Sequence, residues 1–269
     1  MNLNNVINLS LRILLKHRLL WLTAFALFSV LVSAALAAEF GGRQPATLAL
    51  DVGLSALRLA LPLFMIFQVQ ELFSKEFERK FYLLSLSYPV SRLQWFAGRF
   101  AALLVVTTIL LLLAVGLLAA GVTVIGQGYA QPTPVSLGLP LAVTTLFIGL
   151  DLLVLLALAC FLAVVASTPS FVLIGTLGFM LIARSYSAVL ALIASNAALV
   201  DNAEAYRSSL GVLGYLLPDL GALDVRMTAL YGQMGFLPED WPLLTASALL
   251  YALGFMALTL WLFRKKQFA

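Results

Sequence analysis

The sequence predicts an all-α integral membrane protein with six transmembrane helices, and three observations lead to this fold class. Hydrophobic residues make up 62% of the 269 residues, and the mean hydropathy is +1.04. Only 10% of the residues are charged, whereas soluble globular domains carry about 25%. The apolar residues are gathered in six long runs, and about 20 apolar residues in a helix cross a bilayer. Residues 1–269 are therefore expected to form a single transmembrane domain.

The first 18 residues predict an amphipathic helix that lies in the membrane surface. Polar or basic side chains recur at every fourth position from Asn4 to Lys16, beside a separate apolar stripe. The uncharged run at 19–38 is the first expected span. A signal peptide is the alternative, because Ala35-Leu36-Ala37 resembles a cleavage site. The apolar run is, however, longer than the roughly 7 to 15 residues of a signal core.

The second span is expected at 52–70, after a loop at 39–51 that contains two glycines and a proline. Arg58 lies about two turns inside the outer end of this span, so its side chain is expected to snorkel outward. Pro62 predicts a kink, which neighbouring helices can accommodate.

The third span is expected at 100–125, with Trp95 and Arg99 just before it as anchors at the membrane interface. The fourth span is expected at 140–166, after an uncharged outer loop. A tight turn at 167–170 should make the fourth and fifth spans antiparallel neighbours.

The fifth span is expected at 171–200 and the sixth at 243–263. The polar segment between them, 201–241, should lie outside the cytoplasm. Its apolar piece at 210–217 is too short to cross a bilayer. Surface or re-entrant helices are therefore expected in this segment.

The distribution of basic residues predicts the orientation. If the N-terminus is cytoplasmic, eleven Lys and Arg residues lie on the cytoplasmic side and three lie outside. Such an excess of basic residues is typical of cytoplasmic loops. Both termini are therefore expected in the cytoplasm, together with the connection at 71–99. The eleven residues are Arg12, Lys16, Arg18, Lys75, Arg79, Lys80, Arg92, Arg99, Arg264, Lys265 and Lys266, and the three are Arg43, Arg207 and Arg226.

Two charged residues, Asp151 and Arg184, interrupt the fourth and fifth expected spans. Each would cost about 2.5 to 3.5 kcal/mol at the centre of an isolated span. Both should lie near the membrane midplane on neighbouring antiparallel helices. A structural ion pair between them is therefore favoured over a role in the substrate path or in a proton relay.

Several kinds of chemistry are disfavoured by what the chain lacks. It contains no Gly-x-x-x-x-Gly-Lys-[Ser/Thr] phosphate-binding loop, so ATP binding by that route is not expected. A single cysteine, Cys160, excludes an intrachain disulfide and a cysteine metal cluster. The single histidine, His17, is expected at the membrane interface. The net charge of +4 follows the topology, so no nucleic-acid partner is expected.

The stretch 71–99 is, apart from the chain ends, the only one dense in basic residues. Phe73, Phe77 and Phe81 fall at helical spacing, so a helix here would present an aromatic stripe beside charged residues. Pro89 then ends that helix. These residues alone leave a plain connecting loop and a partner-binding helix equally open.

The motifs in this stretch resemble the loop between spans two and three of type-2 ABC transporter permeases. The resemblance rests on Ser74–Lys80, on Tyr88–Arg92 with its Pro-Val-Ser-Arg turn, and on Gly98-Arg99, where the family usually has Gly-Lys. Residues Tyr215–Asp219 and Ala229–Gly232 are also similar to this family.

The resemblance implies the permease subunit of an ATP-binding cassette exporter in a bacterial cytoplasmic membrane, surrounded by lipid. This subunit would not be an enzyme and would hold no cofactor or metal. ATP and Mg²⁺ would be bound by a separate ATPase subunit, and a second permease copy, identical or related, would complete the path. The coupling helix would dock into the ATPase. The residues expected to couple the two subunits are Phe73, Glu76, Phe77, Glu78, Arg79, Lys80, Phe81, Pro89 and Arg92.

Two other functions stay open at this point. A secondary transporter or channel without an ATPase would need a coupling charge within the membrane, for which only Asp151 qualifies. A non-transporting membrane assembly factor would share the topology and the partner-binding loop. The transported substrate is not specified by these residues.

The expected topology can be tested by cysteine labelling. A cysteine at Gln131 should react with a membrane-impermeant maleimide in whole cells, because the charge distribution places this loop outside. A cysteine at Lys75 should react only after the cells are lysed. Labelling of both positions from the same side would contradict the six-span topology.

Overall fold

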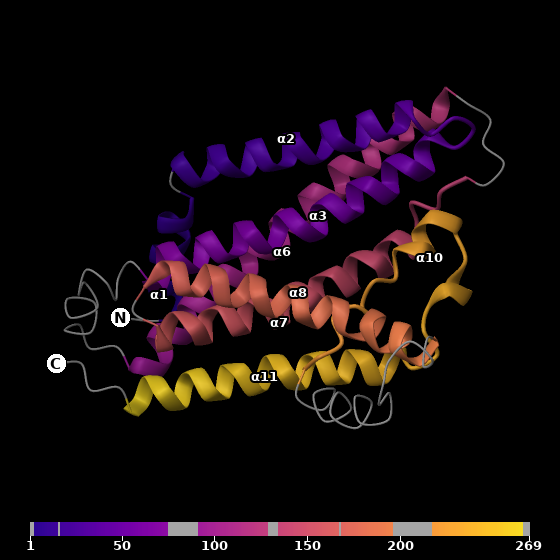
Figure 1. Ribbon diagram of the computed structural model, residues 1–269. Coiled ribbons are helices and arrows are strands. Elements are labelled where there is room, and N and C mark those ends of the chain that lie inside the picture. Colours follow the sequence, from indigo (N-terminus) through magenta and orange to yellow (C-terminus); the bar gives the residue numbers. More distant parts are fainter. Residues whose placement is uncertain are drawn as a thin grey trace.

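The computed structural model describes residues 3–15, 17–74, 91–128, 134–166, 168–195 and 217–265. The described residues form helices joined by loops, without a β-strand. Six of these helices are long and apolar enough to cross a membrane, which confirms the all-α membrane fold at this level, and Figure 1 shows them side by side. The six are α2 (His17–Glu39), α3 (Pro45–Val69), α6 (Arg92–Gln127), α7 (Leu139–Val165), α8 (Pro169–Ser195) and α11 (Trp241–Lys265).

The second span begins earlier than predicted, because the loop expected at 39–51 is only 40–44. Pro45 occupies the first turn of α3, where its fixed φ suits a helix and its missing N–H costs nothing. Gly42 has a φ of 52°, which allows the tight turn between α2 and α3. At its other end α3 continues into a π-helical turn, η1 (Gln70–Ser74).

The third span also begins earlier than predicted, at Arg92 rather than at 100. Ser91 caps α6, since its Oγ accepts a hydrogen bond from Gln94 N and the Gln94 side chain accepts one from Ser91 N. Trp95 and Arg99 therefore lie inside the helix, each with only 3% of its surface exposed. Their side chains pack within the protein, and their expected position at the membrane interface stays a prediction.

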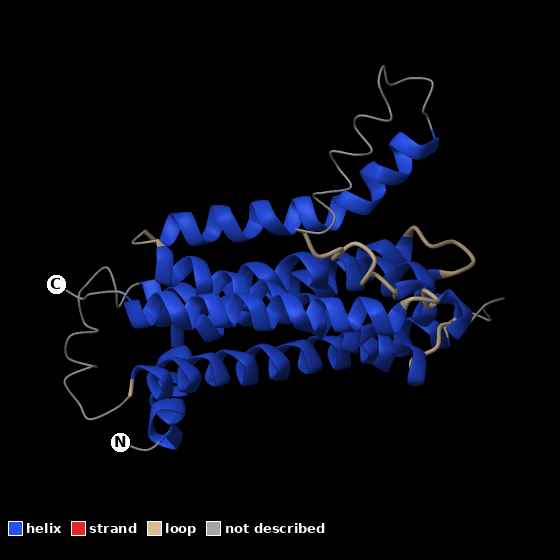
Figure 2. Cartoon of the chain, turned by 90° about the horizontal axis from the view of Figure 1, so that it is seen from below, coloured by secondary structure: helices blue, strands red, loops and turns tan. Residues whose placement is uncertain are grey.

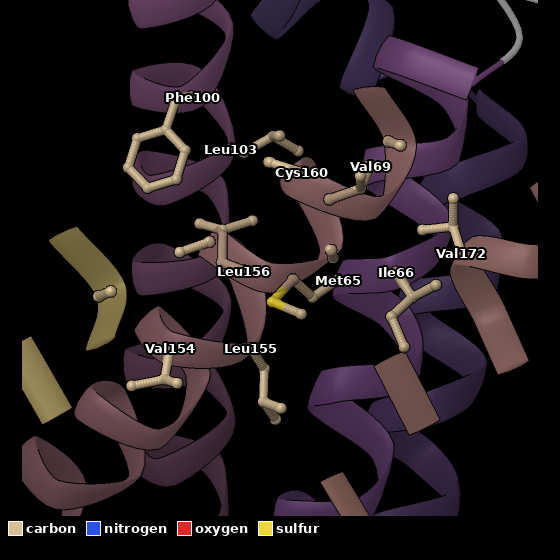
Figure 3. Close-up of a cluster of buried hydrophobic side chains, with 14 of the residues drawn as sticks. Met65, Ile66, Val69, Phe100, Leu103, Val154, Leu155, Leu156, Cys160 and Val172 are labelled. Atoms are coloured by element: carbon tan, nitrogen blue, oxygen red, sulfur yellow. The ribbon is translucent and has the colours of Figure 1, made fainter. Parts of the chain in front are cut away.

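Helix α7 forms the centre of the bundle and agrees with the predicted fourth span to within one residue at each end. It contacts α3, α6, α8 and α11, and its residues from Val154 to Cys160 are almost entirely buried. Figure 3 shows Met65 of α3 beside Leu155 and Leu156 of α7 in this core. Burial on all sides explains why α7 has no polar face.

The outer helices α2, α8 and α11 bury a much smaller share of their side chains than α7. Large apolar residues such as Phe25 of α2, Ile174 of α8 and Leu250 of α11 are exposed. In a chain that spans a membrane, such faces are covered by lipid rather than by water. The described loops gather mainly at the end of the bundle opposite α1 (Figure 2).

The N-terminal helix α1 (Leu3–Leu14) packs across the beginning of α6. Val6, Ser10 and Leu14 are its buried residues, and a Cβ at Gly98 of α6 would lie 2.8 Å from the Val6 side chain. The helix itself agrees with the predicted N-terminal helix, whereas its placement in the membrane surface stays a prediction. Figure 1 shows α1 at the same end of the bundle as the C-terminal end of α11.

Candidate functional site

A non-helical segment, residues 217–225, enters the bundle from the end opposite α1. Leu220, Leu223 and Val225 are at most 2% exposed. A Cβ at Gly221 would lie 2.6 Å from the backbone oxygen of Arg184, which is near the middle of α8. Residues 217–225, which we call the re-entrant segment, therefore pack between the long helices, and short α10 (Arg226–Tyr231) and η3 (Met234–Phe236) follow. The membrane depth expected for the 201–241 segment stays a prediction.

The backbone of this re-entrant segment finds its hydrogen-bond partners within the protein. Leu220 O accepts a hydrogen bond from Arg58 Nη2 at 3.2 Å, and Val225 O accepts one from Thr228 Oγ1 at 2.7 Å. Asp219 Oδ1 accepts a hydrogen bond from Ala222 N at 3.0 Å. These contacts are needed because irregular backbone is tolerated at membrane depth only where protein or water satisfies it.

Six charged residues meet along this segment and form what we call the ion-pair chain. Its members alternate in sign and come from α3, α7, α8 and the segment with the start of α10. Three are acidic and three are basic, so their formal charges cancel. In spatial order the ion-pair chain consists of Asp51, Arg226, Asp224, Arg58, Asp151 and Arg184.

The inner end of the ion-pair chain holds the two residues that the sequence analysis paired. Arg184 Nη2 donates to Asp151 Oδ2 at 2.5 Å, and Asp151 is fully buried. Arg184 Nη1 also donates to the backbone oxygen of Arg58 at 2.9 Å. In a regular helix that oxygen would accept a hydrogen bond from the backbone N–H of residue 62. Residue 62 is a proline and has no N–H to donate. Arg184 therefore replaces the helical hydrogen bond that Pro62 removes from α3.

Arg58 connects the two halves of the ion-pair chain, and the prediction that it snorkels outward was wrong. Its Nη1 lies 2.5 Å from Asp224 Oδ2, its Nη2 lies 3.7 Å from Asp151 Oδ2, and it is 7% exposed. Since α3 begins at Pro45, Arg58 lies near the middle of the helix, where its guanidinium group pairs with Asp224 and Asp151.

The charges of the predicted spans indicated that a further carboxylate pairs with them, although Asp224 was not among the predicted site residues. The predicted spans held Arg58 and Arg184 but only one carboxylate, Asp151. An unpaired buried arginine is costly, so a second carboxylate had to reach the same depth. Asp51 precedes the second expected span but pairs with Arg226, and the carboxylate that pairs with Arg58 is Asp224, from the polar segment 201–241.

The outer end of the ion-pair chain is closer to the surface and contributes less. Arg226 Nη1 lies 3.0 Å from Asp51 Oδ1 and bonds to Ser55 Oγ, while its Nε lies 3.5 Å from Asp224 Oδ2. The Arg226 and Asp51 side chains are 32% and 38% exposed, and ion pairs accessible to water contribute at most about 1 kcal/mol.

A second cluster, which we call the loop base, holds the two ends of segment 75–90. Phe73 of η1 is fully buried and contacts Trp95 of α6, with ring centroids 5.7 Å apart. Phe263 of α11 stacks on the other side of Trp95 at 5.3 Å. The Arg99 guanidinium lies 3.9 Å from the Trp95 ring centroid and donates to Leu72 O.

Three further hydrogen bonds tie the loop base to neighbouring spans. Arg92 Nη1 donates to Phe263 O at 3.4 Å and to Arg264 O at 3.2 Å, which satisfies backbone oxygens at the C-terminal end of α11. Gln70 Nε2 donates to Pro169 O at 2.8 Å, at the start of α8.

These contacts change the role of one predicted coupling residue. Phe73 packs within its own chain and leaves no surface for an ATPase, so its assignment as a docking anchor was wrong. Arg92, predicted to hold the end of the loop, holds α11 as well. The other predicted coupling residues lie outside the described residues: Glu76, Phe77, Glu78, Arg79, Lys80, Phe81 and Pro89.

The two clusters are built from ion pairs and from packed aromatic rings. No group of three or more His, Cys, Asp or Glu residues that could hold a metal ion occurs among the described residues. Asp151 is occupied by guanidinium groups, and Cys160 is buried among apolar side chains. The arrangement can hold helices in register and transmit movement between them.

Comparison with known proteins does not assign this chain to a family. No family model matches the chain, and no curated protein matches it.

The two arginines beside Asp151 predict unequal effects of charge removal. Asp151→Asn should lower the yield of folded protein more than Arg184→Gln, because Arg184→Gln leaves Asp151 with Arg58 as a partner. Removing one member of a buried pair costs about 3 to 5 kcal/mol. Combining both substitutions should recover part of the loss, measured as detergent-solubilised yield and melting temperature. Normal yield without transport in both single variants would instead indicate a functional charge.

The close approach of the re-entrant segment to α8 predicts that Gly221→Ala is destabilising. The added Cβ would lie 2.6 Å from Arg184 O and 2.8 Å from Ser187 Oγ, so the segment must move. The matched control is Gly178→Ala on α8, where a Cβ meets no atom within 4 Å. That change should be neutral or stabilise by up to about 1 kcal/mol. A wild-type melting temperature for Gly221→Ala would contradict the described packing.

Proposed function

We propose that this chain is the permease subunit of an ATP-binding cassette exporter and that a separate ATPase subunit binds and hydrolyses ATP. The observation that carries the proposal is the loop base. Segment 75–90 leaves from η1 and returns to α6, and both ends are held by the same packed rings, Phe73 and Trp95. A loop that receives force from another subunit can move the spans only if it is firmly attached to them.

The hydrogen bonds of the loop base support a role in transmitting movement. Gln70 contacts the start of α8, and Arg92 contacts the end of α11. Displacement of segment 75–90 would therefore act on four spans at once, namely α3 and α6 directly and α8 and α11 through these bonds. Coupling through contiguous packed elements of this kind is what a two-state permease requires.

Helix α3 would extend this movement to the middle of the membrane. Its C-terminal end is η1 in the loop base, and its middle carries Arg58 in the ion-pair chain. In the proposed cycle, ATP-driven closure of the ATPase subunits pushes the loop base, and α3 transmits the change to α7, α8 and the re-entrant segment. The permease pair would thereby switch between its two states.

The ion-pair chain supports this proposal over a secondary transporter. Asp151 would have to bind and release a coupling ion, but Arg58 and Arg184 both engage it. A membrane assembly factor would keep the same loop base, so this alternative is separated by measuring ATPase activity and transport.

The proposal places the loop base on the cytoplasmic side of a bacterial cytoplasmic membrane, with both termini on that side. A second permease copy, identical or related, would complete the path, and lipid would surround the pair. Basic residues at the loop-base end support this orientation. The described ones are Arg12, Arg18, Arg92, Arg99, Arg264 and Lys265.

The coupling role predicts that Phe77→Ala weakens the ATPase complex without unfolding the permease. Loss of one central aromatic anchor should reduce the free energy of association by at least ~2 kcal/mol, which corresponds to a roughly thirtyfold lower affinity for the ATPase. Co-purification of the ATPase and its stimulation should fall, while the abundance of the chain in the membrane stays normal.

Phe73→Ala is the matched control for this experiment. It removes the same side chain four residues earlier, but from the buried loop base, where loss of a core phenylalanine costs about 3 to 5 kcal/mol. This variant should therefore lower membrane abundance. A Phe77→Ala chain that keeps its ATPase partner and its transport rate would reduce the loop to a connector and remove the main support for the proposal.

A further inference from the structure

Helix α2 lies at the edge of the bundle and diverges from α3 toward its own N-terminal end (Figure 1). Side-chain burial along α2 follows this divergence. Val30 and Ala34, in the half near the α2–α3 turn, are at most 5% exposed. No residue from Trp21 to Ser29 is buried. The N-terminal half of α2 therefore stands away from α3 and leaves a wedge between the two helices.

The wedge contains an apolar groove with a volume of about 530 Å³, lined by α2 and α3 alone. It runs from Leu22 to Ser33 on α2 and from Ala56 to Phe67 on α3. The side chains in it are apolar apart from two serines, and both hydroxyls are already used. Ser29 Oγ donates to Phe25 O and Ser33 Oγ donates to a backbone oxygen of the same helix. An occupant therefore needs no polar group.

The dimensions of the groove restrict what can fill it. On each helix its ends are eleven residues apart, which at ~1.5 Å per residue gives a length of roughly 16 Å. The groove closes toward the α2–α3 turn, where Val30 and Ala34 are buried. A tapering groove of this kind suits a flexible extended hydrocarbon chain better than a rigid helix of constant diameter, about 10 Å.

The surroundings of the groove indicate where that chain comes from. Both walls belong to helices long and apolar enough to cross a membrane, and exposed Phe25 and Leu59 border the groove on its lipid-facing side. Helices α2 and α3 lie further apart toward the start of α2, which is the end of the bundle at which α1 lies (Figure 1). A lipid of the leaflet on that side can insert a chain without crossing the midplane first.

We infer that the groove between α2 and α3 is a binding site for one acyl chain of a membrane phospholipid from the leaflet at the α1 end. The chain fills the space that α2 and α3 leave between them and restores the van der Waals contacts that an empty gap would forfeit. The bound lipid thereby becomes part of the packing of α2. This inference requires that the helices span a membrane, and it is independent of the transport proposal.

The site can be tested with the purified full chain in nanodiscs that contain a phospholipid with a diazirine near the end of one acyl chain. After photolysis, mass spectrometry locates the adducts. Adducts should concentrate on groove residues such as Ala26 and Ala60 and exceed those on Ala24, which is exposed outside the groove. An even distribution over all exposed positions of α2 would overturn the inference.

A matched pair of substitutions makes the test specific. Ala26→Phe fills the groove, whereas Ala24→Phe adds the same side chain two residues away on the exposed face of α2. Only Ala26→Phe should lower the adducts at Ala60 to the level of ordinary lipid-facing positions. If Ala26→Phe gives little folded protein, Ala60→Phe fills the groove from α3, and the adducts at Ala26 are measured instead. Unchanged adducts in the filled variant would overturn the inference.

A cysteine at position 26 tests whether a second copy occupies the groove. The native Cys160 is buried, so it does not interfere with mild oxidation. Ala26→Cys should stay monomeric under oxidation in nanodiscs with excess lipid, because an acyl chain separates it from other proteins. A disulfide-linked dimer through this position would show that protein, and not lipid, fills the wedge.

Discussion

Charges in the middle of the bundle need counter-charges at the same depth, and the arrangement of the half of the molecule opposite α1 depends on this constraint. Helices α3 and α8 each contribute an arginine there, Arg58 and Arg184, whereas α7 contributes only Asp151. The remaining carboxylate, Asp224, comes from outside the helices, so residues 217–225 have to enter the bundle. The same arginines also donate to backbone oxygens, which makes the irregular backbone tolerable where water is excluded.

Helix α3 is the element through which the two clusters are connected. Near its middle, Pro62 removes a helical hydrogen bond, and Arg184 of α8 supplies the replacement. At its C-terminal end the helix changes to a π-helical turn, where Leu72 O accepts from Arg99 and Phe73 packs on Trp95. Turns of this kind are frequent at functional sites because they free backbone groups for other contacts. The ion-pair chain and the loop base are therefore joined by one continuous helical element.

Local sequence patterns beyond hydropathy predict part of this arrangement. Pro45 at a helix start, and the Ser-x-x-Gln pattern that begins at Ser91, indicate the true starts of the second and third spans. Arg58 had no carboxylate partner within the predicted spans, which required a carboxylate from elsewhere in the chain. The identity of that carboxylate was not readable, because the contact between Arg58 and Asp224 joins residues 166 positions apart through a segment without periodicity.

The sequence by itself determined the six apolar helices, because crossing a membrane requires only a sufficient length of apolar residues. It also indicated the pairing of Asp151 with Arg184, because a short turn makes their helices neighbours and each charge is costly without the other. Only the tertiary structure decided that Arg58 turns inward and that Phe73 packs within its own chain. It also decided that α2 stands away from α3. These features depend on which side chains from distant parts of the chain fill the same space, and hydropathy and spacing along one helix carry no information about that.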